Sequence, residues 1–157
     1  MSFEWVNNKY DYEYIYRSNL GAYVDIKNIL TFLLDKPKNN FYCGIVGKDS
    51  YYLGREVEFA SGSGYFLSKD LVELVLKYKN MWNHNIVDDV ALGELLSNFN
   101  IKVDKRAKRK NISNNEVFYQ IGDKNVEYIN EHDIYHVRLR SDNREEDINN
   151  MIKLFKK

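Results

Sequence analysis

Segments with the two-residue period of a strand alternate along this chain with segments that have the period of a helix. Alternation over residues 10–16 predicts a strand, and residues 17–21 break it as a loop. Asp25 is a good N-cap for a helix that ends before Pro37. One face of this helix is expected to carry Ile26, Ile29, Leu30, Leu33 and Leu34.

Later segments continue the same alternation. Ser68 is expected to cap a helix over residues 69–78, and Asp88 and Asp89 open the next helix, which runs to about Phe99. The other expected elements are strands at 41–46, 51–59, 65–67, 117–121 and 134–139, and a helix at 145–155. Because helices and strands are interleaved, we predict an α/β fold.

The chain has 157 residues, and we expect residues 1–157 to form one domain. Basic and acidic residues balance at 23 each, so no global field recruits nucleic acid or an anionic membrane. The single cysteine, Cys43, excludes an internal disulfide framework and fits a reducing compartment. The start of the chain lacks a secretory-signal pattern, and no apolar run reaches the roughly 20 residues that cross a bilayer. We therefore expect a cytoplasmic protein without a transmembrane segment.

Two short segments contain candidate catalytic or ligand-binding residues. Residues 60–64 read Ala-Ser-Gly-Ser-Gly, which predicts a flexible turn where glycine lets a ligand approach the backbone. Asp88 and Asp89 lie together at a predicted helix N-terminus, which stabilises carboxylates. One acid suffices for capping, and a pair of like charges suits a general base. From these residues alone, capping and catalysis both remain open for the pair.

The two segments form linked motifs: residues 59–70 read FASGSGYFLSKD, and residues 88–93 read DDVALG. In this order and spacing they resemble the β-1,3-galactosyltransferase and Fringe-like glycosyltransferases, which have the GT-A fold, over about residues 10–103. The resemblance implies a GT-A-like mixed sheet flanked by helices. It also implies sugar transfer from a nucleotide-sugar donor to the hydroxyl of a glycan or glycoconjugate acceptor. In that reaction Asp89 deprotonates the acceptor hydroxyl beside Asp88, and the sugar-binding cleft is shaped by Ser61, Gly62, Ser63 and Gly64.

The resembling family has an Asp-x-Asp metal motif where this chain reads Arg17-Ser18-Asn19-Leu20. Without carboxylates there, Mn²⁺ would lack its hard anionic ligands. We expect Arg17 and Asn19 to contact the substrate, and Arg17 to direct its positive charge toward the leaving diphosphate. The alternative is that Arg17 is a surface arginine at the end of a strand. A downstream histidine completes the family's metal and diphosphate site. His136 is its candidate counterpart, supported by Arg138 on the same strand face.

In the family, a nucleotide-binding half precedes the metal motif, and this chain has space for one strand there. We therefore expect most of the nucleotide-binding half to be lacking. Three explanations are open: the chain is a fragment, another chain supplies the nucleotide-binding half, or the fold has lost donor binding. The alternative to a partial transferase is a non-catalytic carbohydrate-binding or accessory module derived from such an enzyme. No nucleic-acid partner is expected, because the basic run at 105–110 lacks interleaved aromatic residues and is typical of a solvated loop.

Overall fold

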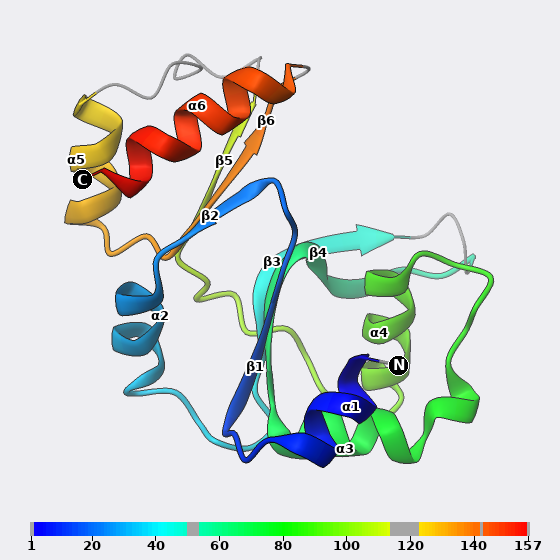
Figure 1. Ribbon diagram of the computed structural model, residues 1–157. Coiled ribbons are helices and arrows are strands. Elements are labelled where there is room, and N and C mark those ends of the chain that lie inside the picture. Colours follow the sequence, from blue (N-terminus) through cyan, green and yellow to red (C-terminus); the bar gives the residue numbers. More distant parts are fainter. Residues whose placement is uncertain (1, 50–53, 114–122, 142, 157) are drawn as a thin grey trace. The chain divides into compact units, whose positions relative to one another are not determined.

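The computed structural model describes residues 2–49, 54–113, 123–141 and 143–156 (Figure 1). Two compact units are present, the first formed by Met1–Ser18 and Pro37–Ala107, the second by Asn19–Lys36 and Lys108–Lys157. Each unit combines a small sheet with helices, so the predicted α/β class is confirmed. No helix in these described ranges is long and apolar enough to cross a membrane. The expectation of one domain stays a prediction.

The first unit is built on an antiparallel sheet in the order β1-β4-β3, so β4 is the central strand (Figure 1). Its strands are β1 (Tyr14–Ser18), β3 (Tyr42–Asp49) and β4 (Val57–Ser68). Its helices are α1 (Ser2–Lys9), α3 (Lys69–Lys77), the short 3₁₀ helix η1 (Lys79–Met81) and α4 (Asp88–Ser97).

One face of this sheet packs against α3 and α4. Tyr65 and Leu67 of β4 lie in a buried core with Leu71 of α3 and Leu92 of α4, and Ile15 of β1 packs against it. Since side chains alternate along a strand, Arg17 shares the face of Ile15 and sits at the edge of this apolar layer. A guanidinium in that position needs a polar partner.

The predicted turn at residues 60–64 is wrong, because these residues belong to the 12-residue strand β4. The strand is irregular there. Gly44 of β3 pairs with Tyr65 and Val46 pairs with Ala60, so one β3 residue faces the four residues 61–64 of β4. Gly62 and Gly64 therefore lie in a bulge within β4 rather than in a loop between two strands.

The second unit has a mixed sheet in the order β2-β6-β5, where β2 is antiparallel and β5 parallel to β6. Its strands are β2 (Ala22–Val24), β5 (Arg109–Ser113) and β6 (His136–Arg140), and its helices are α2 (Ile26–Leu33), α5 (Asp123–Glu131) and α6 (Arg144–Phe155). Val137 and Leu139 of β6 share a core with Ile129 of α5 and Leu154 of α6.

The structure confirms the start of helix α2 but corrects its buried face. The predicted cap is confirmed, because Asp25 Oδ1 accepts a hydrogen bond from Asn28 N at 3.0 Å. The predicted apolar face is partly wrong: Ile29 is buried as expected, but the other buried residue is Phe32, whose ring lies 4.9 Å from that of Tyr135. Three residues of the expected face are exposed, namely Ile26, Leu30 and Leu34.

Other boundaries also differ from the sequence prediction. Residues 10–13 do not extend β1, and 109–110 of the basic run belong to β5 rather than a loop. Helices α1 and α5 were not predicted, and the strand expected at 117–121 lies outside the described residues. Ser68 takes the N-cap position of α3, but its Oγ accepts from Phe41 N at 3.0 Å instead of capping the helix.

Gly93 allows α4 to approach β4 closely. A Cβ at this position would lie 2.5 Å from Phe59 Cβ and 2.8 Å from Glu58 O. We expect Gly93→Ala to lower the free energy of unfolding, because an overpacking cost of about 1–3 kcal/mol outweighs the helix propensity of alanine, about 1 kcal/mol. Urea denaturation of both proteins measures the difference.

Gly21→Ala is the matched control, because a Cβ there would meet its nearest neighbour, Leu139 O, at an ordinary 3.4 Å. This control should change the free energy of unfolding little. A Gly93→Ala protein as stable as the wild type would contradict the close packing of α4 on β4.

Candidate functional site

The irregularity in β4 turns one backbone group toward α4. The β3–β4 register passes over residues 61–64, and a half-buried N–H without a partner is costly. Gly62 N donates instead to Asp89 Oδ2 at 2.7 Å. This bond joins the bulge of β4 to the first turn of α4, and it brings the two sequence motifs together.

Asp88 and Asp89 are the first two residues of α4, and Val87 is the N-cap without a side-chain hydrogen bond. The capping interpretation is therefore wrong for both acids. Asp89 Oδ1 accepts from Val90 N at 3.1 Å, while its Oδ2 accepts from Gly62. The positive end of the helix favours negative charge at both positions.

Arg17 of β1 completes the cluster. Its Nη2 lies 2.8 Å from Asp88 Oδ2, and the side chains are 35% and 62% exposed respectively. Such an exposed pair contributes about 0–1 kcal/mol to stability, so its main effect is to orient Arg17 and Asp88. We refer to Arg17, Gly62, Asp88 and Asp89 as the acid-pair cluster. All four were predicted site residues.

Two side chains approach Gly62 closely. A Cβ there would lie 2.7 Å from Arg17 Nη1 and 3.1 Å from Asp89 Oδ2. On either side, Ser61 Oγ and Ser63 Oγ lie 3.0 Å apart, and Ser63 is buried. Gly64 pairs with Ser18 of β1. The structure thus gathers the predicted glycine-serine segment against the acid pair.

Two buried tyrosines below the cluster were missed by sequence analysis. The guanidinium Cζ of Arg17 lies 5.6 Å from the ring centroid of Tyr65, within cation–π range. Burial raises the pKa of Tyr65 to about 12, which the Arg17 charge partly opposes, so the phenol stays protonated at neutral pH. Tyr42 Oη accepts from Ala60 N at 2.8 Å, at the start of the bulge. Strand alternation marks both tyrosines as inward-facing, but nothing in the sequence links them to the acids.

The remaining predicted site residues, Asn19, His136 and Arg138, lie in the second unit. His136 is fully buried on β6, and its Nε2 lies 3.2 Å from Arg109 Nη2. Because arginine only donates, Nε2 accepts this bond and the neutral ring carries its proton on Nδ1. Burial, together with the positive charges of Arg109 and Arg138, lowers the pKa of His136 to about 3.

The donor atoms present do not fit a divalent cation. Within the parts of the chain that the structure describes, no group of three or more His, Cys, Asp and Glu side chains is placed to hold a metal ion. Asp88 is paired with Arg17, both oxygens of Asp89 accept backbone N–H groups, and the His136 Nε2 lone pair faces Arg109. A divalent ion prefers several anionic oxygens.

Comparison with known families identifies the class of protein. Residues 1–107 of the 157, which contain the whole acid-pair cluster, match the family model described as galactosyltransferase. This match supports a glycosyltransferase-like function. The chain belongs to the galactosyltransferase family. A search of curated proteins found no significant relative. Membership of the Fringe-like branch stays a prediction.

The buried neutral His136 predicts a pH-dependent stability. In the unfolded chain a histidine gains its proton near pH 6.5, whereas the folded protein resists protonation down to about pH 3. The unfolded state therefore binds more protons in this window, and stability is complete above pH 6.5 and falls as the pH falls. We expect a loss of about 1–2 kcal/mol between pH 6.5 and pH 5, measured by urea denaturation.

His136→Gln keeps an acceptor near Arg109 and should flatten this slope. The exposed His132→Gln is the matched control and should keep the wild-type slope. An unchanged slope in His136→Gln would show that another group causes the acid sensitivity.

Proposed function

We propose that this chain transfers a sugar from a nucleotide-sugar donor to an acceptor hydroxyl, with Asp89 as the general base and Asp88 as its neighbour. The observation that carries the proposal is the hydrogen bond between Gly62 N and Asp89 Oδ2, which joins the two family-like motifs into one cluster.

The chemistry follows from the lone pairs of Asp89. A carboxylate has about four acceptor positions, and two of them are used by Gly62 N and Val90 N. Another can accept the proton of an acceptor hydroxyl. The acceptor oxygen then forms a bond to the anomeric carbon of the donor sugar, the bond from that carbon to the diphosphate breaks, and Asp89 holds the proton.

Arg17 is suited to the leaving group. Its side chain is partly exposed, with Nη2 on Asp88 and Nη1 buried beside Gly62, and its positive charge can stabilise the negative charge that develops on the diphosphate. The same proposal includes a sugar-binding cleft shaped by Ser61, Ser63 and Gly64. It also includes contacts to the donor from Asn19, His136 and Arg138, and a nucleotide-binding half that another chain supplies.

The test is sugar transfer by Asp89→Asn, with mass-spectrometric detection of product from a panel of UDP- and GDP-sugars. This change keeps the shape of the side chain and an acceptor for Gly62 N but removes the base. We expect the rate to fall by about 10²- to 10⁴-fold, the usual contribution of a general base.

Asp88→Asn is the matched control, because it removes one negative charge from the same helix N-terminus without changing Asp89. Because Asp88 is more exposed and paired with Arg17, its loss should cost much less than the loss of Asp89. Wild-type rates in Asp89→Asn, or an equal loss in Asp88→Asn, would remove Asp89 as the base.

A second candidate function is a non-catalytic carbohydrate-binding or accessory module. It is favoured by one observation: Asp89 and Asp88 already have structural partners in Gly62, Val90 and Arg17. This candidate predicts glycan binding without transfer. Calorimetry with UDP- and GDP-sugars, with and without Mn²⁺, separates the two, because the transferase must bind a donor and the module need not.

A further inference from the structure

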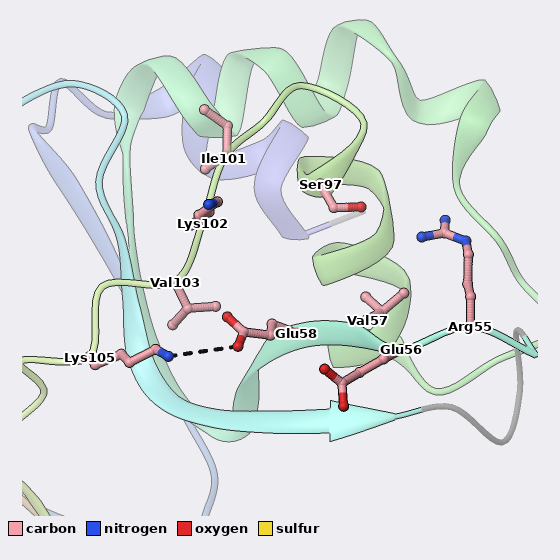
Figure 2. Close-up of a pocket in the computed structure, with 9 residues that line it drawn as sticks. All are labelled: Arg55, Glu56, Val57, Glu58, Ser97, Ile101, Lys102, Val103 and Lys105. Atoms are coloured by element: carbon pink, nitrogen blue, oxygen red, sulfur yellow. Dashed lines mark ion pairs between the residues drawn. The ribbon is translucent and has the colours of Figure 1, made fainter.

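The first unit has a groove that the proposed chemistry does not use (Figure 2). Its volume is about 470 Å³, and it is lined by the start of β4, the last turn of α4 and the segment that follows α4. This volume lies within the roughly 300–1,000 Å³ of small-molecule pockets. None of the acid-pair cluster lines it.

The groove has an aliphatic part. Val57 of β4 and Val103 are buried, and Ile101 lies on the same segment as Val103. Figure 2 shows these side chains on both sides of the groove, with Ser97 at the end of α4. Aliphatic side chains next to a hydroxyl suit a ligand that has C–H and O–H groups close together.

Charges of both signs surround this aliphatic part. Glu58 Oε1 lies 3.7 Å from Lys105 Nζ, a pair that Figure 2 marks with a dashed line. Glu56 Oε1 lies 2.8 Å from Lys48 Nζ. At the opposite end, Arg55 Nη2 lies 3.3 Å from Glu94 Oε1. Within the described chain, four of the five charged residues that line the groove are therefore ion-paired, and Lys102 is the fifth.

These ion pairs favour an uncharged ligand, because a charged ligand would have to compete with them. A phosphate would be repelled by Glu56 and Glu58, and a cation by Arg55, Lys102 and Lys105. A wholly apolar ligand would desolvate these charges without replacing their hydrogen bonds. An uncharged ligand with many hydroxyls meets neither penalty, because each hydroxyl both donates and accepts.

We propose that this groove binds a neutral saccharide unit. The assignment of that unit to the acceptor rests on the proposed transferase function. Asp89 and Ser97 are eight residues apart on α4, which is about 12 Å along the helix. The groove would therefore hold a sugar residue of the acceptor that is distant from the reacting hydroxyl, and it would favour extended acceptors.

The experiment is a ¹H–¹⁵N NMR titration of the whole chain, without donor, using lactose, cellobiose and maltose in turn and inorganic phosphate as the anionic comparison. We expect saturable shifts of the Glu58, Ser97 and Val103 amides with at least one disaccharide and none with phosphate. Shifts with phosphate alone, or no shifts with any disaccharide, would overturn the proposal.

Glu58→Gln removes the charged acceptor of the groove and should weaken disaccharide binding by about tenfold or more. Glu73→Gln, an exposed glutamate on α3, is the matched control and should bind as the wild type does. The spectra also report folding of each variant. Equal affinity in Glu58→Gln and Glu73→Gln would overturn the assignment of the groove.

Asp89→Asn separates this proposal from the proposed function. The groove lies outside the acid-pair cluster, so this variant should keep disaccharide binding while it loses transfer. Disaccharide binding by a wild-type chain that transfers no sugar would support the groove and contradict the transferase.

Discussion

Four residues of β4 face one residue of β3, and among them Gly62 N has its hydrogen-bond partner outside the sheet. A continuous ladder would have satisfied this N–H group within the sheet. The bulge instead presents Gly62 N to the first turn of α4, where Asp89 accepts it at 2.7 Å. A hydrogen bond to a charged group contributes about 1.5–3 kcal/mol, more than the exposed Arg17–Asp88 pair contributes.

The other features of the site follow from that one bond. At position 62 a Cβ would lie 2.7 Å from Arg17 Nη1 and 3.1 Å from Asp89 Oδ2, so a larger residue would make these side chains shift. Gly93 lies one helical turn after Asp89, where a Cβ would lie 2.5 Å from Phe59 Cβ and 2.8 Å from Glu58 O. Arg17, at the edge of the apolar layer, finds its partner in Asp88 because the bond to Asp89 fixes the start of α4. Backbone geometry therefore sets the arrangement of the charges.

Local patterns predicted much of this arrangement from the sequence. The α/β class, the helices that begin after Asp25 and at Asp88, and the contact between the glycine segment and the acid pair followed from periodicity and from the family resemblance. The bulge could not be predicted, because a glycine-serine segment has the same composition in a turn and in an irregular strand. The buried face of α2 was also missed, since tertiary contact with Tyr135 selects Phe32 over Ile26.

The Gly62–Asp89 hydrogen bond itself can be observed. NMR detects scalar coupling across a hydrogen bond, here between the amide nitrogen of Gly62 and the carboxylate carbon of Asp89. We predict a measurable coupling in the wild-type protein, together with slow exchange of the Gly62 amide proton. No detectable coupling, with a Gly62 amide that exchanges as fast as an exposed one, would contradict the account of how the site is held together.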